Sequence, residues 1–284
     1  MKKFLSLPPV AFVAETAELF LGVGASRSAA ALSYFLILTL FPLLVCVNYL
    51  IGLFHLDLEN LLQSLDQLLP AGVLAVLGDY LRYVAASQSP ALLLASLFTI
   101  LVSASAGLRT LLAAMDGLHG TAGAHPLRRV AFSVVLSVLF LLTVYLSVVV
   151  IFTGEWFFRL LEERLPQHLA ELVPLADLSG LWRWMRYLLL FCFVLLLVLI
   201  VYRAGTPRGA VRLPVVALSS LLAALAISAA SVVFSWFIGM SSRYALIYGS
   251  LASLIILLVW LYLCGNLLLL GAVVGRVLEN RLRR

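Results

Sequence analysis

Side chains that could hold a metal ion or attack a substrate are few in this sequence, and they are scattered. The histidines and cysteines are His55, His119, His125, His168, Cys46, Cys192 and Cys264. No histidine belongs to an HExxH pair or lies at metal-ligand spacing from a carboxylate, and each cysteine stands alone in an apolar stretch. GxSxG, Walker and glycine-rich phosphate-binding motifs are also missing from the sequence. We therefore expect no catalytic residue, no metal site and no cofactor, which argues against an enzyme.

Arg109 and Asp116 are the charged residues that come nearest to the interior of an apolar stretch. Seven residues separate them, about two helical turns, so both lie on one face of a helix. They could pair with each other, or hold a substrate headgroup or a cation. In the alternative interpretation, Arg109 extends to lipid phosphates and Asp116 is solvated just beyond the membrane. Acids are otherwise missing from the centres of the apolar stretches, which disfavours simple ion-coupled transport.

Three polar or helix-bending residues inside the apolar stretches are candidates for a packing or functional role. Pro42 lacks an amide hydrogen and clashes with the carbonyl group four residues earlier, so it kinks or opens its helix. The freed backbone groups are available to a neighbouring helix, water or a substrate, although a packing kink is the commoner outcome. The amides of Asn48 and Asn266 are expected to face the interior of a helix bundle, where they find hydrogen-bond partners.

Polar and charged residues near the apolar stretches are most frequent in the last third of the chain. Arg203 begins a short basic connection, whose arginines could serve merely to orient the chain. Tyr248 and Gly249 lie at the start of the final apolar stretch, where a glycine permits close helix approach. Gly271 and Gly275 form a GxxxG pair further along the same stretch, which is therefore expected to be central to packing.

The elements that must position these residues are membrane-spanning helices. Of the 284 residues, 64% are hydrophobic and 11% are charged, and the mean hydropathy is +1.13. An ordinary soluble domain is about 45–50% apolar and about 25% charged, so a water-soluble globule is excluded. Six stretches have the about 20 apolar residues that cross a bilayer: approximately 29 to 54, 90 to 114, 129 to 153, 184 to 203, 212 to 238 and 246 to 276. The sequence thus predicts an all-α polytopic integral membrane protein with one membrane domain, residues 1–284.

The charges predict the orientation of the spans, because Lys and Arg favour the cytoplasmic side in short loops. With both termini in the cytoplasm, thirteen of the nineteen basic residues lie inside against four acids, and six lie outside against nine acids. The inner basic residues are Lys2, Lys3, Arg27, Arg109, Arg128, Arg129, Arg203, Arg208, Arg212, Arg276, Arg281, Arg283 and Arg284. Since these residues are spread over the loops rather than gathered on one face, we expect no nucleic-acid partner.

Three segments outside the spans are expected to be amphipathic helices. Leucines recur at helical spacing over residues 57 to 69, and apolar and charged residues alternate over residues 156 to 165. Both segments fall on the outer side. The third segment, residues 9 to 21, falls on the inner side. We expect these helices to lie in the membrane interface or to pack over the bundle, and a gating role for them stays open.

Several blocks of residues occur in a fixed order along the chain. They are residues 31–35 (ALSYF), 40–44 (LFPLL), 202–203 (YR) with Pro207, 248–253 (YGSLAS), 258–262 (LVWLY) and 270–272 (LGA). In order and spacing, over roughly residues 9 to 280, they resemble the YihY/BrkB family of bacterial inner-membrane proteins. The resemblance implies six spans in the bacterial plasma membrane. Family members have carried the label ribonuclease BN, and have also been described as virulence factors and as transporters.

The sequence departs from the family pattern at two positions. Asp116 stands where members often have an Asn, and Val273 replaces an acid that often follows the late Gly-Ala pair. The second departure weakens any cation-coupled mechanism that relies on that acid. The function we expect is transport of a lipidic or amphipathic substrate, with membrane lipids as partners. A cation/proton exchanger that uses Asp116 and a non-transporting structural or partner-binding membrane protein are the alternatives. Ribonuclease activity ranks last, and self-association into a homo-oligomer is left open.

Overall fold

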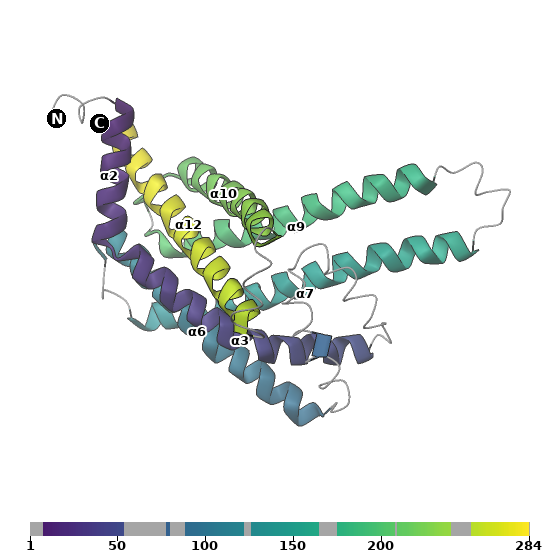
Figure 1. The fold of residues 1–284 in the computed structure, drawn as a ribbon. Coiled ribbons are helices and arrows are strands. Elements are labelled where there is room, and N and C mark those ends of the chain that lie inside the picture. The colour runs from purple at the N-terminus through teal and green to yellow at the C-terminus, as the bar shows by residue number, and fades with distance from the viewer. Residues whose placement is uncertain are drawn as a thin grey trace.

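The chain folds into long helices. The computed structural model describes residues 8–53, 78–79, 89–121, 126–164, 175–207, 209–239 and 251–283, and these ranges contain no strand. Figure 1 shows the helices, which are α2 (Pro8–Gly22), α3 (Ala25–Leu53), α6 (Pro90–Leu118), α7 (Pro126–Arg164), α9 (Leu175–Gly205), α10 (Leu213–Gly239) and α12 (Leu251–Arg283). Helices suit a chain of this composition, because in lipid every backbone N–H and C=O group must find its partner within the protein.

Six of the described helices are long and apolar enough to cross a membrane, which confirms the number predicted from the sequence. The apolar windows are Ala25–Val47, Pro90–Leu118, Arg129–Ser147, Tyr187–Gly205, Leu213–Trp236 and Leu254–Arg283. Each coincides with one of the predicted stretches, within a few residues at most ends. α2 is an additional helix, which corresponds to the segment predicted at residues 9 to 21.

Proline and glycine mark several helix boundaries. α6 and α7 both begin at a proline, Pro90 and Pro126, whose missing N–H group would have no partner in the first turn of a helix. Gly24, between α2 and α3, has a φ of +64°, and Gly120, just after α6, has a φ of +69°. Side chains other than glycine rarely adopt this left-handed region, so the two glycines let the chain leave one helix and turn toward the next.

The six spanning helices form a closed ring. α3 packs on α6, α6 on α7, α7 on α9, α9 on α10 and α10 on α12, and α12 closes the ring against α3. The first and last spans are therefore neighbours. α2 lies outside the ring against α12 and the start of α3, and Figure 1 shows it running across the direction of α7 and α9.

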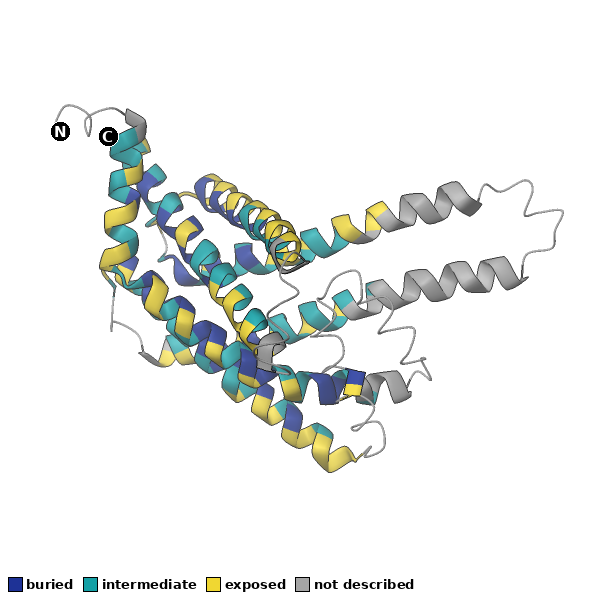
Figure 2. Cartoon of the chain, viewed as in Figure 1, coloured by how far each residue is buried: buried dark blue, intermediate teal, exposed yellow. Residues whose placement is uncertain are grey.

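The tightly packed core lies toward one end of the ring. Its buried residues include Ala29 of α3, Met115 of α6, Tyr202 of α9, Val215 of α10 and Val273 of α12. Figure 2 shows buried residues on the side where α2 and the end of α12 lie, and further ones along α3 and α6. This end carries the connections that the charge distribution assigns to the cytoplasm. We therefore call it the cytoplasmic end.

All six helices of the ring are longer than the hydrocarbon core is thick, and α7 and α9 extend furthest beyond the others on one side. α7 has 39 residues and α9 has 31, which correspond to lengths of about 58 Å and about 46 Å, whereas the hydrocarbon core is about 30 Å thick. Figure 1 shows both helices extending past the others, away from the cytoplasmic end. Residues 156–164, expected to have a structure of their own, are instead the last part of α7. The amphipathic segment predicted at residues 57 to 69 lies outside the described residues.

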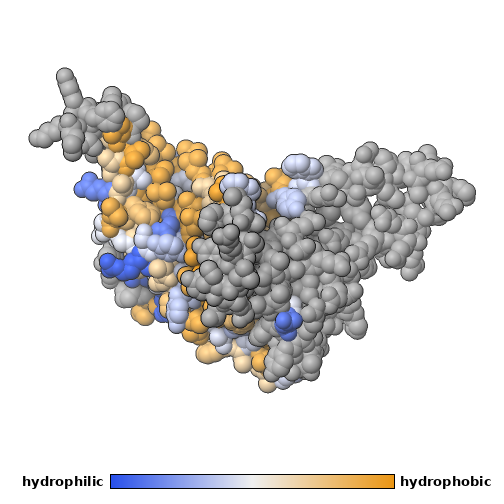
Figure 3. All heavy atoms as spheres, in the orientation of Figure 1, coloured by the Kyte–Doolittle hydropathy of each residue, from blue (hydrophilic) through white to orange (hydrophobic). Residues whose placement is uncertain are grey.

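The described surface is largely apolar around the ring. Leu94 and Phe98 of α6 are 67% and 69% exposed, as expected for side chains that face lipid. Trp184 of α9 and Trp236 of α10 are exposed toward the ends of their helices that lie opposite the cytoplasmic end, where tryptophan is typical of a membrane–water interface. Figure 3 shows orange, apolar residues over most of the described surface on this face, with hydrophilic residues on the side of α2.

Candidate functional site at the cytoplasmic end

A buried carboxylate joins the last helix to the connection between α9 and α10. Glu279 of α12 has no exposed surface, in a helix that is otherwise apolar up to its last turns. Its Oε2 accepts a hydrogen bond from the backbone N–H of Arg212 at 3.1 Å, and its Oε1 accepts one from Nε of Arg283 at 2.7 Å. Nε of Arg212 lies 3.4 Å from Oε1. Two arginines and a backbone amide therefore neutralise this carboxylate.

Two arginines of α12 also hold the same connection by its carbonyl groups. Arg283 donates from Nη2 to the carbonyl oxygen of Gly209 at 2.7 Å and to that of Ala210 at 3.3 Å. Arg276 donates from Nη1 to the carbonyl oxygen of Ala210 at 3.2 Å. Together with Glu279, these contacts fix the cytoplasmic end of α12 to the α9–α10 connection, and they close the ring on this side.

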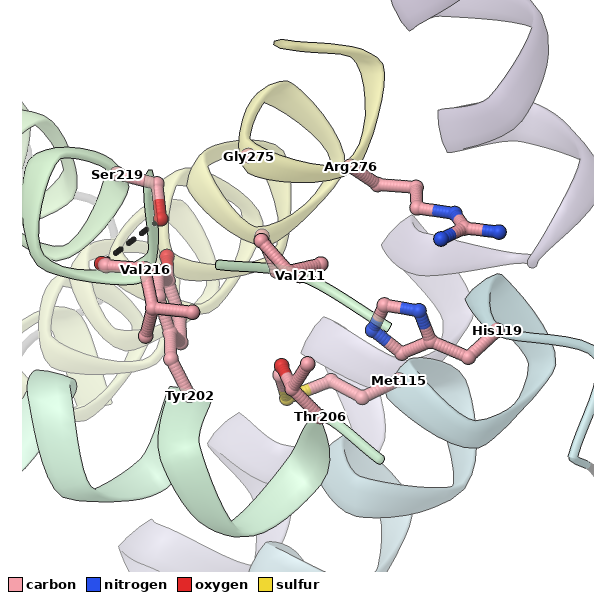
Figure 4. Close-up of a pocket in the computed structure, with 10 residues that line it drawn as sticks. Met115, His119, Tyr202, Thr206, Val211, Val216, Ser219, Gly275 and Arg276 are labelled. Carbon is pink, nitrogen blue, oxygen red and sulfur yellow. Dashed lines mark hydrogen bonds between the residues drawn. The ribbon is translucent and has the colours of Figure 1, made fainter. Parts of the chain in front are cut away.

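A small pocket lies just inside this closure. It is lined by Met115, His119, Tyr202, Thr206, Val211, Val216, Ser219, Ala272, Gly275 and Arg276, which come from α6, α9, α10, α12 and the α9–α10 connection. Its volume is about 10 Å³, room for roughly one water-sized group. Figure 4 shows His119 and Arg276 on one side of the pocket, with Tyr202, Val216 and Ser219 on the other.

His119 is the unsatisfied group of this pocket. It follows the last residue of α6, and its Nδ1 atom is buried without a hydrogen-bond partner. Burial, and to a smaller extent the nearby positive charge of Arg276, lower the pKa of His119 from its ordinary 6.5 to about 4, against the opposing effect of Asp116. The imidazole is therefore neutral at physiological pH.

The wall opposite His119 is built by a close approach of α9, α10 and α12. Tyr202 donates its hydroxyl hydrogen to the carbonyl oxygen of Leu268 in α12. A Cβ atom at Gly271 would lie 2.5 Å from Oη of Tyr202, and one at Gly275 would lie 2.8 Å from Oγ of Ser219. The two glycines of the GxxxG pair thus allow the backbones to meet at this wall, as their spacing suggested.

The structure pairs Asp116 with a different arginine from the one suggested by the sequence. Nε and Nη2 of Arg129, at the start of α7, donate to Oδ2 of Asp116 at 2.8 and 2.5 Å. Arg109 is half-buried two turns away and has no hydrogen-bond or ion-pair partner in the part of the chain that the structure describes. Of the possibilities that the sequence left open for Arg109 and Asp116, the structure does not show their pairing with each other. A seven-residue spacing puts two side chains on one face, but a neighbouring helix can offer a nearer partner.

Arg203, Pro42 and Asn48, which were also singled out from the sequence, do not line the pocket. Arg203 is exposed in the last turn of α9. α3 continues as one helix through Pro42, which is half-buried, and it also contains Asn48. Tyr248 and Gly249 lie outside the described residues.

Asn266 links the two helices at which the ring closes. Its Oδ1 accepts a hydrogen bond from Oγ of Ser26 in α3 at 3.0 Å, and its Nδ2 donates to the carbonyl oxygen of Tyr262 at 2.8 Å. At the residue just before it in α12, a Cβ atom on Gly265 would lie 3.2 Å from Cβ of Ala29. This span is central to packing, as the sequence indicated, since α12 contacts α2, α3, α6 and α10.

Sequence reasoning did not single out Glu279, at the closure of the ring, or His119, in the pocket, as functional residues. Glu279 carried a signal, since it is an acid flanked by Arg276 and Arg283 at helical spacing. His119 carried none, because its burial depends on how α6 ends against α9, α10 and α12. In the described part of the chain, His, Cys, Asp and Glu form no group of three that could hold a metal ion.

Comparisons with known proteins find one matching family and several relatives. The profile of the family described as Virulence factor BrkB matches residues 18–284. The chain is 24% identical to the ribonuclease-like protein YfkH of Bacillus subtilis over 260 residues, which cover 91% of both chains. It is 35% identical to a UPF0761 membrane protein of Vibrio cholerae over 108 residues, which cover 37% of this chain and 35% of that protein. No solved structure matches.

These relatives and the six apolar helices together identify a multi-pass protein of the bacterial inner membrane. The family match extends from α2 to the end of α12, so it includes the whole ring and all the residues of the pocket. The chain belongs to the Virulence factor BrkB family.

Proposed function

We propose that the protein is a transporter that moves a lipidic or amphipathic molecule across the inner membrane. The observation that carries this proposal is the distribution of charge over the ring. In the described membrane windows, every Asp, Glu and Arg lies in the part nearer the cytoplasmic end, and the remaining length of each window is uncharged. A molecule with an anionic head and an apolar tail matches this arrangement better than a bare ion does, because the tail needs no polar groups along its path.

The buried hydroxyl groups of the spans support the same interpretation. Ser33, Thr39, Ser137 and Ser220 are buried, and each donates its hydrogen to a carbonyl oxygen three or four residues earlier in its own helix. Hydroxyl groups used in this way do not form a ring of ligands that could replace the hydration shell of a cation.

The cation/proton exchanger is weakened as an alternative by the contacts of Asp116. Its carboxylate faces the guanidinium of Arg129 at 2.5 Å, so a cation at this position would have to displace a bound arginine. The non-transporting alternative predicts no flux of any substrate. The description 'ribonuclease-like' belongs to YfkH, the relative from Bacillus subtilis. For the present chain, we infer that it is not an enzyme.

A reconstitution experiment tests the proposal. The full-length protein is inserted into liposomes that contain a trace of fluorescent phosphatidylglycerol, and dithionite is added outside to bleach the accessible leaflet. We expect the protein to expose lipid of the inner leaflet to dithionite, beyond the extent seen with an unrelated six-span protein at equal density. Vesicles loaded with the pH dye pyranine, under a Na⁺ or K⁺ gradient, are measured in parallel.

Together with tests for a copurifying partner and for RNA cleavage, the flux measurements distinguish four functions. Protein-dependent lipid movement with a silent pyranine signal supports the proposal. Cation-driven proton flux that Asp116→Asn abolishes, with no lipid movement, replaces it by the exchanger. No flux of either kind, together with a stoichiometric copurifying partner, replaces it by the non-transporting alternative. Metal-dependent cleavage of RNA by the purified protein, lost on substitution within this chain, would restore the nuclease interpretation.

A further inference from the structure

The pocket at the cytoplasmic end offers positive charge and hydrogen-bond donors without a carboxylate. Its ten lining residues include one arginine, one histidine and three hydroxyl-bearing residues, but neither Asp nor Glu. The three hydroxyls belong to Tyr202, Thr206 and Ser219, and those of Tyr202 and Ser219 already donate their hydrogens to the carbonyl oxygens of Leu268 and Val216. The donors of Arg276 are therefore the ones that matter for a ligand. Walls of this chemistry favour an anionic oxygen over a cation.

Arg276 supplies the charge. Among the described residues its hydrogen-bond partner is the carbonyl oxygen of Ala210, through Nη1, and it faces no carboxylate within ion-pair distance. This distinguishes it from Arg129, Arg212 and Arg283, each of which meets an acid. A guanidinium has five N–H donors in a planar fork that matches phosphate and carboxylate geometry. Arg276 therefore keeps donors and an uncompensated charge for a ligand.

His119 supplies the second group. Its buried Nδ1 atom has no hydrogen-bond partner, although the great majority of buried polar atoms in proteins have one. Figure 4 shows its ring on the same side of the pocket as the guanidinium of Arg276. A ligand oxygen placed between the two side chains would meet a guanidinium and an imidazole together.

We propose that the pocket is an oxyanion site, in which Arg276 and His119 bind one oxygen of a phosphate-type group. The volume of about 10 Å³ admits a single oxygen atom, so the rest of the group would lie at the mouth of the pocket. The oxyanion is either the phosphodiester of a lipid or a free inorganic ion. The lipid case rests on the proposed function and names the headgroup of its substrate, whereas the site itself does not depend on transport.

Binding at this site should be coupled to uptake of a proton by His119. The charged groups that face the imidazole are Arg276 from α12 and Asp116 from α6, and Asp116 is already paired with Arg129 of α7. The lining residues from α9, α10 and their connection carry no charge at neutral pH. A bound oxyanion offsets the charge of Arg276 and stabilises the imidazolium form, which raises the pKa of His119 from about 4. The oxyanion therefore binds more tightly as the pH falls.

Binding of radiolabelled sulfate to the full-length protein in phosphatidylcholine nanodiscs tests the site. Sulfate is chosen because its charge does not change between about pH 6 and about pH 8, the range in which a histidine titrates. Unlabelled dihexanoyl phosphatidylglycerol, whose phosphodiester charge is equally constant, is the competitor. The variants are Arg276→Gln, Arg276→Lys and His119→Gln. The matched control is Arg27→Gln, an exposed arginine in the first turn of α3.

We expect saturable sulfate binding that weakens about tenfold or more in Arg276→Gln, the loss typical of a charge-assisted hydrogen bond. Arg276→Lys, which keeps the charge, should bind better than Arg276→Gln, and this comparison excludes a mere folding defect. Wild-type binding should be tighter at about pH 6 than at about pH 8, and His119→Gln should remove this difference. Arg27→Gln should behave like the wild type.

Displacement of sulfate by the short-chain lipid at a lower concentration than unlabelled sulfate requires assigns the site to a lipid headgroup. Sulfate binding that the lipid does not displace assigns it to a free oxyanion. The proposal is overturned if saturable binding is not found, or if Arg276→Gln and Arg276→Lys both bind as the wild type does. Because the readout is binding, loss of the lipid flux in liposomes would refute the transport proposal without touching this site.

Discussion

Two nitrogens of Arg129 donate hydrogen bonds to the same carboxylate oxygen of Asp116, Nε at 2.8 Å and Nη2 at 2.5 Å. Asp116 lies near the end of α6 and its side chain is 25% exposed, and Arg129 lies at the start of α7 and its side chain is 22% exposed. The pair therefore ties the second span to the third at the cytoplasmic end. It also occupies the acid that an exchanger mechanism would require to be free.

A double-mutant cycle on this pair should give a coupling energy of about 1 kcal/mol, the upper range for partly exposed ion pairs. The variants are Asp116→Asn, Arg129→Gln and the double substitution, and the measurement is the free energy of unfolding. Asp116→Asn combined with Arg109→Gln should be additive within about 0.5 kcal/mol, because these side chains are not paired. Strong coupling to Arg109 instead would mean that Asp116 pairs with Arg109, the possibility that the sequence left open.

Substitution of Gly271 should separate three helices. A Cβ atom there would lie 2.5 Å from Oη of Tyr202 and 2.7 Å from Cβ of Ala223. Gly271→Ala should therefore lower the free energy of unfolding by about 1–3 kcal/mol, the usual cost of overpacking. Gly117→Ala is the matched control, because its Cβ would meet nothing within 4 Å. It should be neutral or should stabilise α6 by up to about 1 kcal/mol. Equal effects of the two substitutions would contradict the close approach.

A disulfide should lock the two helices at which the ring closes. The Cβ atom of a cysteine at Gly265 would lie 3.2 Å from Cβ of residue 29, slightly below the about 3.5–4.5 Å found in disulfides. In a background without Cys46, Cys192 and Cys264, Ala29→Cys with Gly265→Cys should form this bond on mild oxidation. A mobility shift on a non-reducing gel after cleavage between the spans would report it. Ala29→Cys with Gly117→Cys should stay reduced, because a Cβ atom at Gly117 would meet nothing within 4 Å. A bond in that pair alone would contradict the close approach of α12 to α3.

Neutralising Glu279 should loosen the α9–α10 connection. Glu279→Gln leaves Arg212 and Arg283 without their shared carboxylate and weakens the hydrogen bond from the amide of Arg212. We expect the Tm to fall by roughly 3–8 °C, which corresponds to the loss of charge-assisted hydrogen bonds in a chain of this size. Glu18→Gln, at an exposed position on α2, should leave the Tm unchanged. A Tm equally insensitive to both substitutions would show that the buried carboxylate does not hold the connection.

The sequence by itself determined the solvent, the helices and their orientation. Apolar stretches of about 20 residues can enter lipid only as helices, because no water is present there to satisfy a free backbone. The count of six spans and their approximate limits therefore followed from hydropathy alone, and the bias of Arg and Lys assigned one end to the cytoplasm. The GxxxG pair at Gly271 and Gly275 likewise marked a close contact, although not the helix on the other side of it.

Only the tertiary structure decided which helices are neighbours, and the candidate site depends on that. Glu279 accepts a hydrogen bond from the amide of Arg212, which lies 67 positions away in the chain. Asn266 accepts one from Ser26, which lies 240 positions away. No local pattern records such partners. The spacing of Arg109 and Asp116 indicated one helix face correctly but could not show that α7 would bring Arg129 closer. His119 is an unpartnered, neutral imidazole beside Arg276 because α6, α9, α10 and α12 come together around it. Its burial and its protonation state depend on this packing and cannot be read from the residue type.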